Sequence, residues 1–267
     1  MDTIRALVNE DIEKIEQELY KIIETNTSIH NDIKTFINSS SKRIRSLLCI
    51  LYLKANSINI SENLIKLIAA SELIHNASLL HDDVIDDSEQ RRGNLSFYKK
   101  YNPKMAILSG DYLLSIAVKY LLEINNSDIL EIFLNTTEQM SNAELRQYSF
   151  RNKKINLDEY IKIINGKTAS LFIASLESAA ILSGIERYNA RNFGKLYGEL
   201  FQINNDTKQD SIINDKRNGI NTIIDIIGIE KTQILKDNYK EQLREIIKLL
   251  PNNEYSEGLG ALVEILW

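Results

Sequence analysis

Three aspartates at the end of a long apolar stretch are the residues in this sequence best suited to chemistry. Asp82, Asp83 and Asp86 are spaced i, i+1 and i+4, so on a helix Asp82 and Asp86 lie about one turn apart on one face. Stacked carboxylates at a helix C-terminus repel each other and meet the negative end of the helix dipole. A divalent cation would remove both penalties, and Mg²⁺ fits best because it leaves coordination sites for water and phosphate. The alternative is a solvated acidic helix end.

Cationic side chains that could meet a phosphate lie farther along the chain. Arg91 and Arg92 follow the aspartates after a polar turn and suit bidentate phosphate binding, although they could equally pair with Asp87 or Glu89 as surface charges. Lys167 lies in an otherwise apolar stretch and needs an anionic partner, because a buried unpaired ammonium is costly. Carboxylates beside an arginine pair would neutralise a diphosphate from two sides.

The elements that must position these side chains are helices. Two prolines and ten glycines leave few helix-breaking points, and alternating strand patterns are scarce. Ser61 is a predicted N-cap of the helix that ends at the aspartates, and Asn156 with Glu159 resembles a capping box. Predicted helices cover residues 61–86, 105–124, 127–150, 156–184, 191–208 and 237–250. No linker divides the pattern, so we expect one all-α domain over residues 1–267.

The composition excludes several classes of protein. A chain of 267 residues with 43% hydrophobic residues can bury a sizeable core without disulfides. The net charge of −5 argues against general nucleic-acid binding, which needs a basic surface. Cys49 is the only cysteine, which favours a reducing, cytoplasmic compartment. We expect no signal peptide and no transmembrane segment, because no apolar run approaches the roughly 18 residues that span a bilayer.

On these residues the sequence resembles the trans-type polyprenyl diphosphate synthases, particularly their octaprenyl-like long-chain branch. That family carries an aspartate motif followed by an arginine pair, matched here by Asp82 to Asp86 and by Arg91 with Arg92. Its basic motif is matched at residues 41–46, where Lys42, Arg43 and Arg45 keep the cations. Further matches follow in order at residues 74–77, 110–114, 144–147, 167–169 and 198–203. The likeness covers nearly the whole chain.

The resemblance implies an isoprenoid synthase fold, an all-α bundle around a deep central cavity, normally as a homodimer. It implies a Mg²⁺-dependent condensation of isopentenyl diphosphate with an allylic diphosphate, giving a medium- or long-chain all-trans polyprenyl diphosphate. Mg²⁺ would stabilise the leaving diphosphate. The implied isopentenyl diphosphate ligands are Lys42, Arg45, His75 and Arg92, and the implied allylic-substrate ligands are Arg91, Lys167, Thr168 and Gln202. Asp82 and Asp86 would hold the metal, Asp83 would support them, and Lys167 would join them in catalysis.

The family's second aspartate motif is altered in this chain. Asn205 and Gln209 replace its first and last aspartates, while Asp206 and Asp210 keep an i, i+4 spacing, so we expect a metal-binding role for Asp206. The following lid and C-terminal segments are shorter than in typical members of the family. The altered motif supports a second reading, a weakly active or non-catalytic subunit of a heteromeric synthase. A third reading, a terpene cyclase, is disfavoured by the basic residues, because a cyclase has no second diphosphate to hold.

Two small residues bear on the length of the product. Ala77 and Ser78 lie about one helical turn before Asp82, where farnesyl-making relatives carry a bulky aromatic. We therefore expect a product longer than farnesyl, with Ala77 and Ser78 at the top of the chain-binding tunnel. Close packing of helices against small residues is the alternative.

Overall fold

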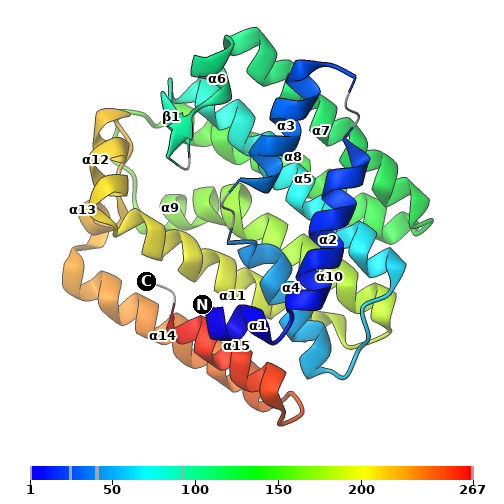
Figure 1. Cartoon of the computed structure of the whole chain (residues 1–267). Helices are drawn as coiled ribbons and strands as arrows, with labels where there is room; N and C mark the ends of the chain where they lie inside the picture. The colour runs from blue at the N-terminus through cyan, green and yellow to red at the C-terminus, as the bar shows by residue number, and fades with distance from the viewer. Residues whose placement is uncertain (1, 24–25, 40–41, 92, 266–267) are drawn as a thin grey trace. The chain divides into compact units, whose positions relative to one another are not determined.

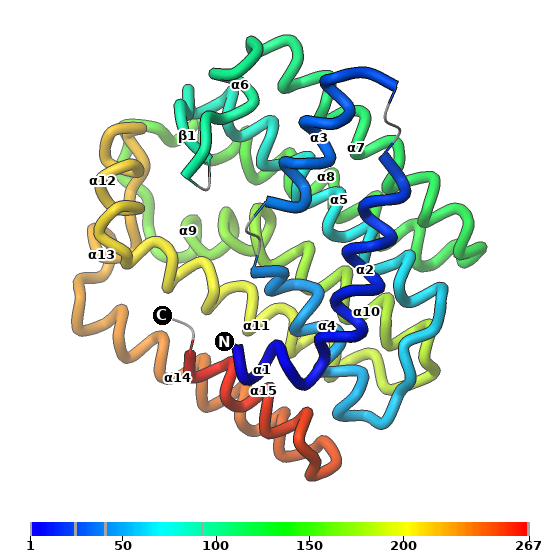
Figure 2. Tube along the Cα trace, viewed as in Figure 1, coloured from blue at the N-terminus to red at the C-terminus, as the bar shows by residue number. Residues whose placement is uncertain are grey.

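The computed structural model describes residues 2–23, 26–39, 42–91 and 93–265. Most of them are helical, which confirms the all-α prediction, and the strands among them are β1 (Gln90–Arg91) and β2 (Asn94–Leu95), an antiparallel pair. The chain forms two compact units, whose helices are labelled in Figures 1 and 2. Unit 1 contains residues 1–7, 51–59 and 131–267, and unit 2 contains residues 8–50 and 60–130. Two of the boundaries fall inside helices, so no linker marks them.

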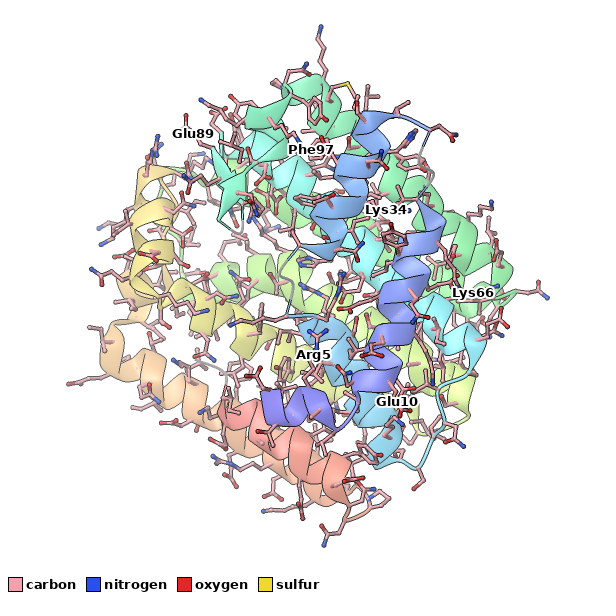
Figure 3. The ribbon with its side chains drawn as sticks, in the orientation of Figure 1. Arg5, Glu10, Lys34, Lys66, Glu89 and Phe97 are labelled. Atoms are coloured by element: carbon pink, nitrogen blue, oxygen red, sulfur yellow. The ribbon has the colours of Figure 1, made fainter. Side chains whose placement is uncertain are left out.

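Unit 2 is built around the helix that carries the aspartates. Its elements are α2 (Asn9–Ile22), α3 (Ser28–Asn38), the first part of α4 (Ile44–Ala55), α5 (Glu62–Ile85), the β1–β2 hairpin, α6 (Phe97–Lys100), α7 (Pro103–Glu123) and the start of α8 (Ser127–Ser149). Lys34 of α3 lies over the ring of Tyr20 of α2, with its Nζ 3.8 Å from the ring centroid (Figure 3).

The helix α5 forms the core of unit 2. It begins at a capped N-terminus and packs closely against α7. The side chain of Ser61 accepts the backbone N–H of Leu64, as the N-cap prediction requires. Lys66 is paired with Glu123, and a Cβ at Gly110 would come within 2.2 Å of the His81 ring. These two contacts, near opposite ends of the helices, show that α5 and α7 run antiparallel and approach closely where Gly110 replaces a side chain.

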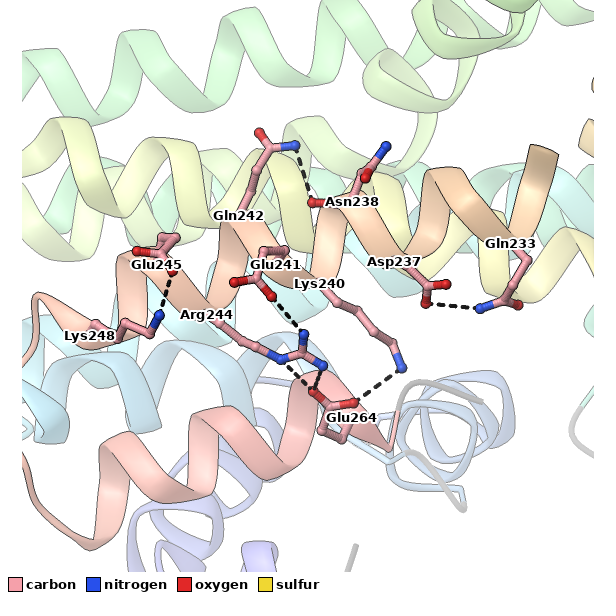
Figure 4. Close-up of polar contacts among 10 residues, drawn as sticks. All are labelled: Gln233, Asp237, Asn238, Lys240, Glu241, Gln242, Arg244, Glu245, Lys248 and Glu264. Atoms are coloured by element: carbon pink, nitrogen blue, oxygen red, sulfur yellow. Dashed lines mark hydrogen bonds and ion pairs between the residues drawn. The ribbon is translucent and has the colours of Figure 1, made fainter. Parts of the chain in front are cut away.

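Unit 1 holds the remaining helices. They are α1 (Asp2–Ala6), the ends of α4 and α8, α9 (Leu157–Ile164), the π-helix η1 (Asn165–Ala169), α10 (Ser170–Ser183), α11 (Arg187–Asp206), α12 (Gln209–Arg217), α13 (Ile223–Ile227), α14 (Ile229–Lys248) and α15 (Glu254–Glu264). Buried Glu177 of α10 accepts hydrogen bonds from Arg187 and Arg191 of α11. Arg244 and Lys240 of α14 hold Glu264 of α15 (Figure 4).

Helices were predicted correctly where a cap and a helical period coincide. The predictions for residues 105–124 and 127–150 correspond to α7 and α8, and α10 ends at Gly184 in the left-handed conformation. Asn156 caps α9 through the N–H of Glu159, but the Glu159 carboxylate binds Arg146 rather than completing the capping box. The helices of residues 2–55, the hairpin and the π-helix were not predicted.

The helix α7 departs from the expectation that no apolar run is long enough to span a bilayer. By length and composition alone its 21 residues could cross a membrane. One such helix is weak evidence, since the core helices of globular proteins pass the same test. Part of α7 packs against α5, with Leu113, Ala117 and Leu121 buried.

Candidate active site

The residues that the sequence places on one face of α5 are all partly open, as are several neighbouring positions in its last two turns. From Leu67 to Ala77 the helix is buried at every position except His75. Toward its C-terminus Ser78, Asp82 and Asp86 are half-buried. These positions follow His75 at i+3, i+7 and i+11, so they lie along one face. We call His75, Ser78, Asp82 and Asp86 the open strip of α5.

Asp83 lies off the open strip, and its side chain binds Arg91 of the β1–β2 hairpin. Its side chain is fully buried, and its Oδ1 accepts two hydrogen bonds from Arg91, from Nε at 2.8 Å and from Nη2 at 2.5 Å. Two charge-assisted hydrogen bonds from one guanidinium to one carboxylate oxygen are strong. They tie β1 to the end of α5. The alternative partners of Arg91, Asp87 and Glu89, are not the ones that the structure shows for it.

The donor set at the end of α5 fits a magnesium ion that is completed by a substrate. Among the described residues no three acidic, histidine or cysteine side chains gather closely enough to hold a metal by themselves. Asp83 is bonded to Arg91, and Asp82 and Asp86 are the two half-buried carboxylates of the open strip. Mg²⁺ is commonly held by one or two carboxylates together with phosphate oxygens and water. The two aspartates match that pattern, and a closed protein cage is not needed.

The predicted cations of the basic motif lie at the start of α4. Lys42 is exposed and precedes the helix, and Arg45, its second residue, is half-buried. Between them Arg43 is buried and adopts a left-handed backbone, with φ at 48°. Arg92, the fourth predicted ligand of isopentenyl diphosphate, lies outside the described residues.

Two of the predicted allylic-substrate residues of unit 1, Thr168 and Gln202, belong to one hydrogen-bonded chain. The hydroxyl of Thr168 in η1 donates to Gln202 Oε1 at 2.7 Å, and Gln202 Nε2 donates to Asp206 Oδ1 at 2.7 Å. Tyr160 of α9 donates to the other oxygen, Asp206 Oδ2, at 2.6 Å. Lys167, next to Thr168, is paired with Glu144 of α8 at 2.5 Å. The structure therefore brings Thr168, Gln202 and Asp206 together.

The surroundings of Asp206 set its protonation. Burial raises the pKa of the carboxyl to about 6, and the hydrogen bonds from Tyr160 and Gln202 and the charge of Lys167 oppose that rise. Burial beside the Asp206 carboxylate also raises the pKa of the Tyr160 hydroxyl well above its usual value. Tyr160 therefore remains a hydrogen-bond donor at neutral pH.

The i, i+4 stacking expected of Asp206 and Asp210 is absent, because the helix breaks between them. The helix α11 ends at Asp206, Lys208 is extended, and α12 begins at Gln209. Asn205, which replaces an aspartate of the family motif, accepts a hydrogen bond from Lys208 Nζ at 2.7 Å. The second motif thus presents an amide and an ammonium beside a buried carboxyl.

The two small residues of α5 are not equivalent. Ala77 is fully buried within unit 2, whereas Ser78 lies on the open strip and turns its hydroxyl onto the carbonyl of His75 at 2.9 Å. Ser78 is therefore the better placed of the two to border a bound chain.

Sequence reasoning missed the partners that hold these residues. Each partner is far away in the sequence. Tyr160 bonds to Asp206 over 46 positions, Glu144 pairs with Lys167 over 23, and Glu72 pairs with Arg43 over 29. Two sequence signals could have pointed to these partners: the glutamate Glu72 within an apolar helical stretch, and the tyrosine Tyr160 in the first turn of α9.

Comparison with known proteins assigns the family. The sequence profile of the polyprenyl synthetase family matches residues 26–257, and the chain belongs to that family. It is 31% identical over 207 residues to the all-trans-nonaprenyl-diphosphate synthase (geranyl-diphosphate specific) of Rhodobacter capsulatus, a match that covers 76% of this chain and 64% of the relative. The chain thus spans slightly less than two thirds of that relative's length.

Solved structures confirm the fold. The crystal structure of a decaprenyl diphosphate synthase from Rhodobacter capsulatus is similar with a TM-score of 0.91 at 22% identity, covering 99% of this chain and 98% of that one. A polyprenyl synthase from Caulobacter crescentus CB15, complexed with calcium and isoprenyl diphosphate, is similar with a TM-score of 0.88 at 22% identity, covering 99% and 96%. The helical fold of this chain is therefore that of the isoprenoid diphosphate synthases.

Proposed function

We propose that this protein is a trans-prenyltransferase that condenses isopentenyl diphosphate with an allylic diphosphate, with Mg²⁺, to form a medium- or long-chain all-trans polyprenyl diphosphate. The observation that carries the proposal is the open strip of α5, where His75, Asp82 and Asp86 lie half-buried on one face of the helix. The family assignment and the long-chain relative support it.

The proposed roles follow the charges of the side chains: carboxylates for the metal, and mainly cationic side chains for the diphosphates. Asp82 and Asp86 would hold Mg²⁺, which when bound would supply positive charge to the departing diphosphate. Lys42, Arg45, His75 and Arg92 would bind isopentenyl diphosphate through charge-assisted hydrogen bonds. Arg91, Lys167, Thr168 and Gln202 would bind the allylic substrate. Asp83, by its two bonds to Arg91, would fix the direction of that guanidinium.

Asp206 is proposed as a further metal ligand of unit 1. Its carboxyl accepts hydrogen bonds from Tyr160 and Gln202, so a cation there would compete with both donors. The raised pKa of about 6 still leaves the carboxylate as the main form at neutral pH, which is the form that a cation needs.

The test is a condensation assay with isopentenyl diphosphate, an allylic diphosphate and Mg²⁺. We expect Asp82→Ala and Asp86→Ala each to lower turnover by about 100-fold or more, the scale of losing one preorganised charge-stabilising group. Asp87→Asn is the matched control, because Asp87 is an exposed carboxylate one residue beyond the strip and asparagine tolerates its left-handed backbone. Normal turnover in Asp82→Ala would refute the assignment.

A second candidate function is a weakly active or non-catalytic subunit of a heteromeric synthase. The observation that favours it is the second motif, where Lys208 binds Asn205 and Asp206 is buried under two donors. If the purified protein binds isopentenyl diphosphate but makes no product by itself, and Asp206→Ala does not change metal dependence, this second function replaces the first.

We also propose that the chain is a single functional domain that works as a homodimer in the cytoplasm. The only cysteine, Cys49, is buried, and burial raises the pKa of its thiol to about 12. A protonated, inaccessible thiol forms no disulfide, so the protein requires no oxidising compartment. The net charge of −5 gives no basis for nucleic-acid binding.

A further inference from the structure

Arg43 stands between two predicted ligands of isopentenyl diphosphate, yet its own side chain points into the core of unit 2. The residue is 3% exposed. Its Nη1 donates to Glu72 Oε2 at 3.1 Å, and its Nη2 donates to the carbonyl of Ile37 at 2.8 Å. The guanidinium is therefore already matched by a buried carboxylate, and it is not presented to an anion from solvent.

Glu72 joins this guanidinium to several helices. It is 1% exposed, and its second oxygen accepts a hydrogen bond from Ser46 Oγ at 2.7 Å. Glu16 of α2 lies 3.7 Å from Arg43 Nε. The network thus connects α2, the end of α3, the start of α4 and the middle of α5. A buried charge pair with several hydrogen bonds specifies one arrangement of the elements that it joins.

The backbone of Arg43 shows that this arrangement is imposed on the basic motif. Its φ of 48° lies in the left-handed region, which is unfavourable for a residue with a Cβ and persists only where the surroundings enforce it. Arg43 joins exposed Lys42 to the first turn of α4, where Arg45 lies. The bonds of its guanidinium to Glu72 and Ile37 anchor the backbone between these two residues.

The other end of the pair is on the helix of the open strip. Glu72 precedes His75 by three residues, about one turn, and precedes Asp82 by ten residues, about 15 Å along the helix. The Arg43–Glu72 pair therefore fixes the basic motif against the same helix that carries His75, Asp82 and Asp86.

We propose that Arg43 is a positioning residue for isopentenyl diphosphate, acting through Glu72 to hold Lys42 and Arg45 in register with the open strip of α5. This inference rests on the proposed function for the identity of the ligand. Arg43 itself does not touch the diphosphate. Removing a residue that orients ligands commonly weakens binding by about 10- to 100-fold, and that is the scale expected here.

The test measures the affinity for isopentenyl diphosphate by calorimetry, with the KM of each substrate beside it. We expect Arg43→Lys to raise the Kd about 10-fold or more, because a lysine keeps the charge but cannot bond to Glu72 and Ile37 together. Glu72→Gln should act in the same direction. The KM of the allylic substrate should change less than two-fold. Arg191→Lys is the control, because Arg191 pairs with buried Glu177 within unit 1, whereas the basic motif belongs to unit 2.

Chemical rescue separates positioning from general stability. Arg43→Gly relieves the left-handed strain and leaves space beside Glu72 for a guanidinium ion, so millimolar guanidinium should restore much of the affinity. It should not do so in Arg43→Gly/Glu72→Gln. If Arg43→Gly does not fold, Arg43→Lys and Glu72→Gln decide the matter alone.

The outcomes are distinct from those of the proposed function. A wild-type protein that binds isopentenyl diphosphate without condensing it refutes the enzymatic function and leaves the Kd comparison valid. A wild-type protein that does not bind it refutes both. A wild-type Kd in Arg43→Lys and Glu72→Gln, or an equal rise in both KM values, overturns the positioning role.

Discussion

At the scale of single residues, the chemistry depends on which side chains of α5 remain partly open. Among the described residues of its buried stretch, His75 breaks the burial pattern, and Ser78, Asp82 and Asp86 continue the same face. The strip aligns half-buried polar side chains on one face of the helix, where they can contact a ligand. The small size of Ser78 then bears on what can lie beneath the carboxylates.

Ser78 is predicted to influence product length. An isoprene unit is about as long as one helical turn, roughly 5 Å, so a bulky side chain one turn before Asp82 should block further elongation. We expect Ser78→Phe to shorten the product while the first condensation continues. Chromatography of the dephosphorylated products measures this. Ser78→Ala should leave the distribution unchanged, because the Ser78 hydroxyl only bonds within its own helix. An unchanged distribution in Ser78→Phe would place the limit elsewhere.

Residues on one helix could be placed from the sequence, and residues held by distant partners could not. The common face of His75, Asp82 and Asp86 follows from the helical period alone. The burial of Arg43 depends on Glu72, 29 positions away, and the setting of Asp206 depends on Tyr160, 46 positions away. A local pattern contains no information about such pairs. The sequence therefore predicted which cations the motif contains, but not that one of them is buried.

At the scale of elements, the sequence predicted helices but not their irregularities. The helix predicted over residues 156–184 includes a π-turn, η1, which carries Lys167 and Thr168. Its formation is linked to Gly166, where a Cβ would lie 2.8 Å from Ala143 Cβ and 3.0 Å from the Gln139 carbonyl of α8. Such irregular turns often occur at functional sites. This tertiary contact cannot be recognised from the sequence around the glycine.

Gly166→Ala should be destabilising because the contact leaves no space for a methyl group. We expect a loss of about 1–3 kcal/mol, the usual cost of overpacking, seen as a fall of several degrees in Tm. Gly260→Ala is the matched control, because nothing lies within 4 Å of a Cβ at Gly260 of α15. That change should stabilise the protein slightly by improving helix propensity. Equal Tm values for the two variants would contradict the packing argument.

A buried glutamate links three elements of unit 1 and should make stability depend on pH. Burial raises the pKa of Glu199 above its ordinary 4.5, against hydrogen bonds from Tyr239 of α14 and Asn165 of η1. The folded state then binds the proton more tightly than the unfolded state. Between 4.5 and the raised pKa, this residue's contribution to stability therefore falls as pH rises, and above that window the contribution is constant.

The measurement compares unfolding free energies of the wild type and Glu199→Gln across pH 4 to 8. The difference, wild type minus variant, should decrease with rising pH and then level off. Tyr239→Phe removes one of the bonds that lower the pKa, so it should extend the decrease to higher pH. A difference that increases with pH would show that hydrogen bonding outweighs burial at Glu199.

At the scale of the whole molecule, α7 has an apolar face that its own unit leaves uncovered. Ile107, Leu108 and Leu122 are 44%, 58% and 57% exposed, and Leu122 follows Leu108 by 14 positions, close to four helical turns, so both lie on one side. The same side carries exposed Asp111 and Lys119. A charged residue in the middle of a membrane span is costly, whereas a protein interface accepts apolar anchors among polar residues.

We therefore predict that this face of α7 binds a second copy of the chain. Leu108→Asp and Leu122→Asp should convert a dimer of about 61 kDa, twice the chain mass of 30.6 kDa, into a monomer, because a buried unpaired carboxylate would oppose association. Light scattering coupled to size exclusion measures the mass. Ile229→Asp is the control, because Ile229 is 71% exposed on α14 of unit 1 and should leave the dimer intact. A monomeric wild type, or a Leu108→Asp variant that remains dimeric, would exclude this face as the interface.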